Sequence, residues 1–434
     1  MLKKNGKRRT GKTFVMVLLI LLVGIAPNFF AAWAKENPIK IGILQPMTGP
    51  FVIYGHPGSA TAQYMAEKIN ERGGVLGRPI EIIVKDDKNT PEIGLREAKS
   101  LILSEKCMFI GGCSSSAVAS TVSDYVKTLN GRAFFLVHCA SASSILEEHG
   151  HRYVGRVGVN TDAVPRAMMM EAGRLWPDTQ RIFLLNPNYN YGHLIVKAFK
   201  ALMPQKFPKA KIVGEAWPPL GTKDFTGYIS AIMAAKPDLI QSTLWGTDAV
   251  SFLKQAEPYG LLSKCKIMCE NMALQEVLGM FRKGDLGVPI GVLGANPYDY
   301  YNHESKEAVD QYTWVHKKTG YYPGAVMGQM AIQYIAAAME KAGTTTDLEK
   351  IVDALAGLTI KDPVLGSVMM RGCDHQTIQG DGIGLIGWDK TGKFPFPIIP
   401  RDSIRYVPPD GLYKSCEEIM KLRETVAKRG GEKK

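Results

Sequence analysis

Short apolar runs alternate with amphipathic segments along most of the chain. The runs IKIGILQ (39–45) and IEIIVKDD (80–87) are typical of buried strands, and a segment with helical spacing follows each of them. Continuous apolar strands between amphipathic helices indicate a parallel sheet that is covered on both faces. This first series predicts strands at 39–45, 80–87, 108–110 and 133–137, and helices at 59–71, 91–103 and 117–129.

A second series begins after a connection near residues 156–160. It predicts strands at 181–185, 211–216, 238–243 and 266–268, and helices at 163–176, 192–202, 224–234 and 248–257. A further strand, three helices and a Gly- and Pro-rich region with short strands follow at 290–294, 305–319, 325–342, 348–356 and 382–388. Two consecutive series predict an α/β fold with two doubly wound lobes.

The first 34 residues are predicted to be a cleaved secretory signal. Six lysine and arginine residues precede the apolar run FVMVLLILLVGIA (14–26), and AAWA (31–34) ends in the small-x-small pattern that signal peptidase cleaves. We expect cleavage after Ala34. The apolar run is shorter than a membrane span needs, which argues against a permanent anchor.

The charge and size of the chain narrow the class of partner. The formal net charge of the 434 residues is +12, and it falls to +6 without the six positive residues of the signal. The remaining charges are of both signs and dispersed, which argues against a nucleic-acid partner. The chain is 45% hydrophobic and long enough for two globular domains. Residues 426–434, which include KRGGEKK, are expected to form a disordered basic tail.

The seven cysteines do not form the pattern of a disulfide scaffold. Cys265 and Cys269 flank a strand-like run, so their Cα atoms would lie about 13 Å apart, beyond the roughly 7 Å limit for a bridge. No cysteine or histidine cluster has the spacing of metal ligands, and we expect neither a metal nor a cofactor. Two pairs remain as candidate disulfides, namely Cys113 with Cys139 and Cys373 with Cys416.

The stretch CMFIGGCSSSAVAS (107–120) runs from a predicted strand into three serines at the start of a predicted helix. A nucleophilic serine would need a G-x-S-x-G turn, whose second glycine is missing here, so we expect no enzyme. A serine helix cap explains one of the three hydroxyls. The unpaired N–H groups and positive dipole end of a helix N-terminus favour a third interpretation, a site for the anionic group of a ligand.

Several motifs, in this order, resemble the type I periplasmic solute-binding proteins of ABC importers, specifically the leucine/isoleucine/valine-binding family. They are IKIGILQPMTGPFVIYG, AEKINERGGVLGRPIEIIVKDDKNTP, FIGGCSSS, NPNYNYG and CDHQ, and the similarity covers residues 38–400. The resemblance implies a monomeric, periplasmic two-lobed clamp joined by three hinge crossings. Such a clamp closes on its solute and delivers it to a membrane permease with ATPase subunits. The expected division is 35–158 with 297–358 for lobe 1, and 159–296 with 359–425 for lobe 2.

The resemblance also implies how a ligand carboxylate is held. Ser114 matches the hydroxyl that binds the carboxylate, and Ser115 follows it at the helix start. The backbone N–H of Ala140 matches a second clamp. Alanine stands at position 142, where the family has threonine, so we expect Ser141 or Ser143 to substitute for the missing hydroxyl.

The remaining site residues follow predicted strands, as Ser114 does, and ligands of open α/β sheets bind beyond the carboxyl ends of strands. Glu270 matches the acid that binds a ligand ammonium group, and Tyr54 and Tyr191 match cleft residues of lobes 1 and 2. Trp245 stands where the family often has tyrosine and is expected to reshape the pocket. The turn around CDHQ is expected to be structural and to lie near the third crossing.

Two ligand classes fit these residues. Ser114 together with Glu270 favours an L-amino acid, and the resemblance favours an apolar, branched-chain type. Trp245 and the altered clamp at Ala142 favour an aromatic or other small carboxylate, a urea or an amide, without an ammonium group. A sensory module with the same fold is a further alternative.

Overall fold

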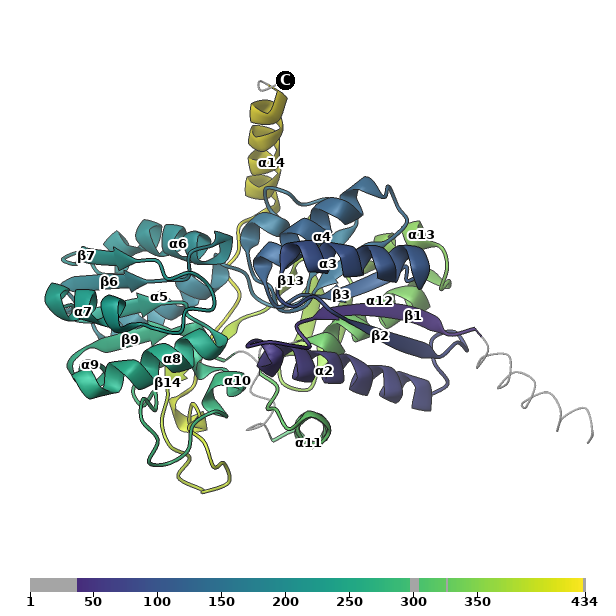
Figure 1. Ribbon diagram of the computed structural model, residues 1–434. Helices are drawn as coiled ribbons and strands as arrows, with labels where there is room; N and C mark the ends of the chain where they lie inside the picture. The colour runs from purple at the N-terminus through teal and green to yellow at the C-terminus, as the bar shows by residue number, and fades with distance from the viewer. Residues whose placement is uncertain (1–36, 297–303, 325–326, 432–434) are drawn as a thin grey trace, which may run out of the picture.

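The computed structural model describes residues 37–296, 304–324 and 327–431. Figure 1 shows two lobes side by side, with helix α14 (Cys416–Gly431) projecting from the region between them. The predicted signal peptide and residues 432–434 of the predicted tail lie outside the described residues. Within the described ranges, no helix has both the length and the apolar character needed to cross a membrane.

The first lobe is built on a parallel five-stranded sheet in the order β2-β1-β3-β4-β5. The residues of β3 and β4 are all buried, as the continuous apolar runs predict, because helices cover both faces of the sheet. Helices α2, α12 and α13 pack on one face, and α3 and α4 pack on the other. The strands are β1 (Ile39–Gln45), β2 (Ile80–Asp86), β3 (Phe109–Gly112), β4 (Phe134–Val137) and β5 (Val154–Arg156), and the helices are α2 (Val52–Glu71), α3 (Pro91–Lys99), α4 (Ser116–Thr128), α12 (Gly328–Ala342) and α13 (Leu348–Leu355).

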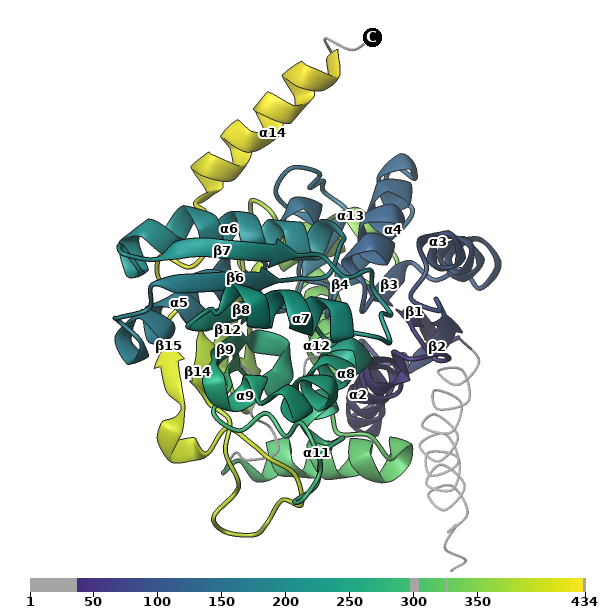
Figure 2. The same ribbon diagram turned by 60° about the vertical axis from the view of Figure 1, so that its left-hand side comes forward.

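The second lobe has a seven-stranded sheet in the order β15-β14-β10-β9-β8-β6-β7. Strands β6 to β10 are parallel, whereas β14 and β15 are antiparallel additions at one edge (Figure 2). Helices α5 and α6 cover one face, and α7, α8 and α10 cover the other. The strands are β6 (Arg181–Leu185), β7 (Lys211–Ala216), β8 (Leu239–Ser242), β9 (Lys266–Cys269), β10 (Leu293–Ala295), β14 (Asp381–Leu385) and β15 (Arg405–Val407), and the helices are α5 (Ala163–Leu175), α6 (Asn190–Lys206), α7 (Thr226–Ala235), α8 (Gly246–Ala256) and α10 (Gln275–Leu278).

The first and third crossings between the lobes are hydrogen-bonded to each other. The Nε2 of Gln376 donates to the carbonyl of Gly158 (2.6 Å), and the N–H of Gly158 donates to Thr377 Oγ1 (2.9 Å). This arrangement confirms that the turn around CDHQ is structural and lies at the third crossing. The second crossing lies between β10 and α11 (Lys306–Thr319), and residues 297–303 are outside the description.

The expected boundary between the lobes at residue 359 is wrong. Strands β11 (Thr359–Asp362), β12 (Gly366–Met370) and β13 (Thr377–Ile378) form a small antiparallel sheet. Ile360 and Val368, both buried there, belong to the hydrophobic core of the first lobe. Residues 359–378 therefore pack with lobe 1, and the chain returns to lobe 2 at β14. Strands this short have too little periodicity to predict which core they join.

Helix α2 begins at Val52, seven residues before the predicted start at 59. Tyr54 consequently lies in the first turn of a helix, not in a loop after a strand. Pro57 is the reason for the difference, because proline cannot donate to the carbonyl four residues earlier and is normally taken as a helix boundary.

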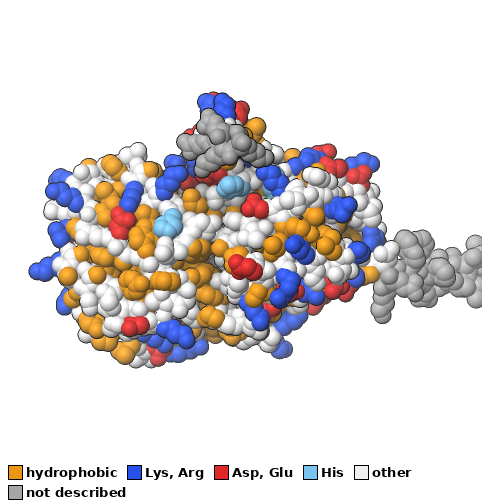
Figure 3. All heavy atoms as spheres, turned by 45° about the horizontal axis from the view of Figure 1, so that its top comes forward, with side chains coloured by type: hydrophobic (Ala, Val, Ile, Leu, Met, Phe, Trp, Pro, Cys, Tyr) orange, Lys and Arg blue, Asp and Glu red, His pale blue; other side chains and the backbone are white. Residues whose placement is uncertain are grey.

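The C-terminal region is helical where a disordered tail was expected. Helix α14 runs to Gly431, so residues 426–431 continue a helix. A disulfide joins Cys373 to Cys416, the first residue of this helix, whereas Cys113 and Cys139 are free. The guanidinium of Arg423 also donates to the carbonyls of Leu146 and Glu147. Figure 3 shows basic and acidic side chains interspersed on the face nearest this helix.

Replacing Cys373 and Cys416 together by serine is expected to lower the free energy of unfolding by about 3–4 kcal/mol. The reason is that the bridge closes a loop of 43 residues, which would otherwise be unconstrained in the unfolded chain. Urea denaturation of the oxidised wild type and the double variant measures the difference. Wild-type protein treated with a reductant should match the variant. Equal stability of the variant and the oxidised wild type would contradict the expectation.

Candidate functional site

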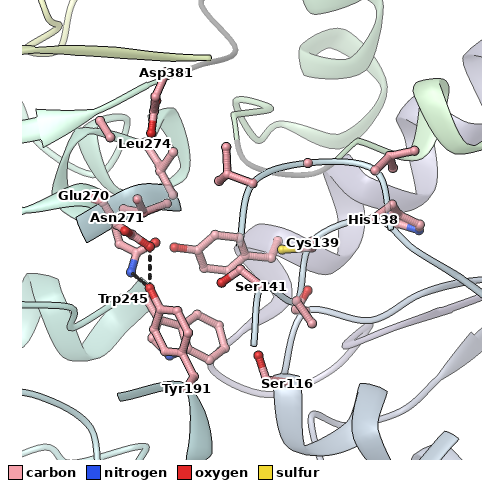
Figure 4. Close-up of a pocket in the computed structure, with 18 of the residues that line it drawn as sticks. Ser116, His138, Cys139, Ser141, Tyr191, Trp245, Glu270, Asn271, Leu274 and Asp381 are labelled. Atoms are coloured by element: carbon pink, nitrogen blue, oxygen red, sulfur yellow. Dashed lines mark hydrogen bonds between the residues drawn. The ribbon is translucent and has the colours of Figure 1, made fainter. Parts of the chain in front are cut away.

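A cavity of about 80 Å³ lies between the lobes, beyond the carboxyl ends of strands from both sheets. This volume is several times what a single water molecule requires. Figure 4 shows residues from both lobes pointing into it. Seven of the predicted site residues line the cavity: Tyr54, Ser114, Ala140, Ser141, Tyr191, Trp245 and Glu270.

The three serines at the start of α4 have three different roles. Ser115 is the N-cap of the helix, where its hydroxyl accepts from the N–H of Ala117 (3.2 Å), and it does not line the cavity. Ser114 lines the cavity but donates its hydroxyl proton to Gln45 Oε1 (2.6 Å). Ser116 also lines it, and its Oγ accepts from a backbone N–H, which leaves its own proton available. Ser115 thus caps the helix outside the cavity, and this position does not support its predicted contact with the ligand.

The second carboxylate clamp is also not formed as expected. The N–H of Ala140 donates to the carbonyl of Cys113 (2.9 Å), so it is not free to bind a carboxylate. Ser143 lies outside the cavity, where its N–H donates to Thr161 Oγ1 (2.9 Å) and its Oγ accepts from the Thr161 hydroxyl (3.0 Å). Ser141 is the serine of this loop whose side chain faces the cavity (Figure 4).

A buried arginine fixes the conformation of that loop. The Nε and Nη2 of Arg156 donate to the carbonyls of Ala140 (3.0 Å) and Ala142 (2.6 Å), and its Nη1 donates to Gln376 Oε1 (3.3 Å). Burial lowers the pKa of Arg156 to about 10. Because this pKa is still well above 7, the guanidinium stays charged at neutral pH. The arginine thus links the cavity loop of lobe 1 to two of the crossings.

A hydrogen-bond network on the second lobe positions a carboxylate at the cavity. The hydroxyl of Tyr191, in the first turn of α6, donates to Glu270 Oε1 (2.5 Å) and accepts from Thr243 Oγ1 (2.5 Å) and Asn271 Nδ2 (2.8 Å). Burial raises the pKa of Glu270 to about 7, and the bond from Tyr191 opposes this rise. Glu270 can therefore gain or lose a proton near neutral pH.

Asp381 is a second carboxylate at the cavity, and it is not among the site residues predicted from the sequence. The residue is 1% exposed, and neither of its oxygens has a hydrogen-bond partner among the described residues. Burial, and next the charge of Glu270, hold the pKa of Asp381 well above its usual range. The N–H of Gly382, which is near the carboxylate without meeting the geometry of a hydrogen bond, opposes this rise. Asp381 is the first residue of an antiparallel strand. The rule that ligands bind beyond the carboxyl ends of parallel strands therefore does not predict it.

The remaining polar residues of the cavity wall add no positive charge. No lysine or arginine lines the cavity within the described ranges. Burial lowers the pKa of His138 to about 4, so its ring is neutral at physiological pH. The positive potential at the cavity therefore comes from helix N-termini, including that of α4 in lobe 1 and those of α6 and α8 in lobe 2, whose residues Tyr191 and Trp245 line the cavity. His138 and Asn271 are also absent from the predicted site residues, although His138 directly follows the predicted strand 133–137 and Asn271 is next to Glu270.

Aromatic side chains join the lobes at the rim of the cavity. The ring of Phe51 lies 4.5 Å from that of Trp245 between centroids, and the ring of Tyr54 lies 5.3 Å from it in an edge-on arrangement. The hydroxyl of Tyr54 also accepts from the N–H of Gly246 (3.1 Å). Because Phe51 and Tyr54 belong to lobe 1 and Trp245 and Gly246 to lobe 2, these contacts exist only while the lobes are together.

The described residues contain no group of three or more His, Cys, Asp or Glu side chains that could hold a metal ion. The cavity wall carries hydroxyls, carboxylates, an amide, a neutral imidazole, a thiol and aromatic rings. These groups can bind and orient a small polar molecule.

Comparisons with known proteins identify relatives over most of the chain. A family model described as periplasmic binding protein matches residues 38–392. The Leu/Ile/Val-binding protein homolog 4 of Brucella abortus (strain 2308) is 26% identical over 369 residues, which cover 80% of this chain and 83% of the relative. The leucine-specific-binding protein of Salmonella typhimurium is 22% identical and covers 86% and 97% of the two chains.

Solved structures with the same fold include solute-binding proteins of ABC transporters. An amino acid ABC transporter substrate-binding protein from Pseudomonas fluorescens Pf-5 superposes with a TM-score of 0.73 at 21% identity, over 86% of this chain and 97% of the other. A solute-binding protein from Rhodopseudomonas palustris BisB5, in complex with 3,4-dihydroxybenzoic acid, has a TM-score of 0.74 at 22% identity, over 86% and 99%. These similarities confirm the two-lobed α/β fold. Because the family model matches most of the sequence, the chain belongs to the periplasmic binding protein family and is a binding protein, not an enzyme.

Proposed function

We propose that this protein is the periplasmic solute-binding component of an ABC importer and captures a small L-amino acid by closure of its two lobes. The family, the predicted signal peptide and the relatives named for leucine, isoleucine and valine binding support this function. Its partners are a membrane permease and the ATPase subunits of the importer. The observation that carries the proposal is the cavity itself, where the N-terminus of α4 in lobe 1 faces Glu270 in lobe 2.

An amino-acid zwitterion matches this polarity. Its carboxylate would bind at the start of α4, near the hydroxyls of Ser116 and Ser141, and its ammonium group would bind Glu270. Ser114 contributes only if its proton moves from Gln45 to the ligand. Each charge-assisted bond contributes about 1.5–3 kcal/mol, whereas micromolar affinity requires about 8 kcal/mol after the costs of association. Lobe closure and burial of the ligand's apolar atoms would supply the remainder.

An aromatic carboxylate is the second candidate ligand. The relative from Rhodopseudomonas palustris in complex with 3,4-dihydroxybenzoic acid and the aromatic wall of Tyr189, Tyr191 and Trp245 support it. A ligand without a positive group, however, would leave Glu270 and Asp381 facing an anion in a buried cavity. Such a ligand would hold both acids in their protonated form, whereas an ammonium group pairs with ionised Glu270 in a charge-assisted bond, so the amino acid is the preferred candidate.

Isothermal titration calorimetry with the twenty L-amino acids, benzoate and 4-hydroxybenzoate tests the ligand class. At least one amino acid is expected to bind, and Glu270→Gln should weaken its binding roughly 10- to 100-fold, because a charge-assisted bond of about 1.5–3 kcal/mol is lost. The variant Glu215→Gln, on β7 away from the cavity, is the control. Tight binding of an aromatic acid that survives Glu270→Gln would favour the second candidate and contradict the first.

The affinity for an amino acid is expected to rise with pH up to about 7 and then level off. Glu270 must lose its proton to bind an ammonium group, and burial raises its pKa in the ligand-free protein to about 7. Binding at pH 5 should therefore be about 10- to 100-fold weaker than at pH 8. The unfolded chain loses this proton at a lower pH, so the contribution of Glu270 to ligand-free stability should fall as the pH rises towards 7. Titrations at several pH values measure the affinity profile, and a flat profile would contradict the role of Glu270.

Phe51→Leu is expected to weaken ligand binding about threefold to tenfold. An aromatic pair contributes about 0.5–1.5 kcal/mol beyond its buried area, and the pair of Phe51 and Trp245 forms only when the lobes meet. Trp314→Leu, which removes a ring pair within lobe 1, is the control. Small-angle scattering should also show a larger radius of gyration for ligand-free Phe51→Leu than for the wild type. Unchanged affinity and radius in Phe51→Leu would show that the rings do not contribute to closure.

A further inference from the structure

Asp381 is a buried acid that the rest of the protein leaves without a partner. It is 1% exposed, lines the cavity, and has no hydrogen-bond partner for either oxygen among the described residues. A carboxylate that serves only the fold is normally paired or hydrogen-bonded, because leaving it unpaired in the interior costs several kcal/mol. A side chain that is buried, unpaired and directed into a ligand cavity is therefore placed to meet the ligand.

Asp381 is positioned at a different part of the cavity from the amino-acid clamp. It begins β14, which pairs with β10 through Ala295 and Ile383, and Ala295 lines the cavity as well. Figure 4 places Asp381 and Glu270 on the same side of the cavity, opposite Ser116 and Ser141, with Leu274 on the same side as the two acids. A ligand held by Glu270 and the start of α4 would thus direct its side chain towards Leu274, Ala295 and Asp381.

The charge of the cavity limits what that side chain can be. Glu270 and Asp381 are the acids that line it, and no lysine or arginine among the described residues opposes them there. A ligand with one ammonium group satisfies Glu270 and leaves Asp381 unpaired. A second protonated nitrogen on the ligand would satisfy Asp381. A site built around a buried polar group binds a ligand that lacks the matching group with much lower affinity.

We infer that the ligand carries two cationic groups, one bound by Glu270 and the other by Asp381. This inference rests on the proposed function and replaces the apolar side chain that the resemblance favours with a basic one. A diamino acid satisfies both acids and the start of α4. A diamine without a carboxylate shares the two cationic groups, so the experiment includes both kinds of molecule.

Calorimetry with L-ornithine, L-lysine, L-norleucine and putrescine at pH 7.5 tests the inference. Norleucine has the side-chain length of a basic amino acid without the second nitrogen. Ornithine or lysine is expected to bind at least tenfold more tightly than norleucine. Asp381→Asn should abolish this preference and leave norleucine binding unchanged or tighter, whereas Glu270→Gln should weaken all three amino acids.

Asp87→Asn is the matched control, since Asp87 is also buried and has an oxygen without a hydrogen-bond partner in the described structure, but lies outside the cavity. It should keep the preference for two charges, and thermal unfolding of each variant checks that it is folded. Equal binding of norleucine and lysine by the wild type, or a preference that survives Asp381→Asn, would overturn the inference.

The outcomes separate this inference from the proposed function. If norleucine binds and neither the basic amino acids nor putrescine binds more tightly, the amino-acid function stands and the second cation is wrong. If putrescine binds and no amino acid does, the two-cation inference stands and the amino-acid function is wrong. If none of the four binds, the inference of two cationic groups is overturned.

Discussion

The buried guanidinium of Arg156 is the contact on which the geometry of the cavity depends. It sits at the first crossing, donates to two carbonyls of the 140–142 loop, and reaches Gln376 at the third crossing. Because those carbonyls turn towards the arginine, the side chain of Ser141 is left on the cavity side. Gln376 in turn bonds to the carbonyl of Gly158, so loop and hinge are held as one unit.

The second lobe brings negative charge to a cavity that has little to balance it. Tyr191, Thr243 and Asn271 hold Glu270 in place through one shared phenolic oxygen. Asp381 adds a carboxylate with no partner in the described structure. Burial raises the pKa of both acids. A cation bound beside either acid lowers the pKa of that acid again, so the acid is charged more readily when the cation is present. Ligand binding is thereby coupled to the ionisation of these acids. It is also coupled to the aromatic contacts, because both occur when the lobes are together.

The amino-acid sequence predicts the lobes and most strands well, because strands buried on both faces appear as continuous apolar runs. It predicts α2 too short, because Pro57 resembles a helix boundary although the helix continues through it. The clamp at Ala140 fails for a different reason, since the hydrogen bond of its N–H to Cys113 is a tertiary contact that no local pattern reveals. Asp381 was missed because its strand is antiparallel and is added after the third crossing. Residue types at strand ends thus predict where a cavity lies, but not which donors in it are free.

Native mass spectrometry of the protein purified from its own host, followed by release and identification of any bound molecule, would show directly what the cavity holds. We expect a small molecule with at least one protonated nitrogen, held in the cavity between Glu270 and the start of α4. A bound aromatic acid, or any other ligand without a basic nitrogen, would contradict it.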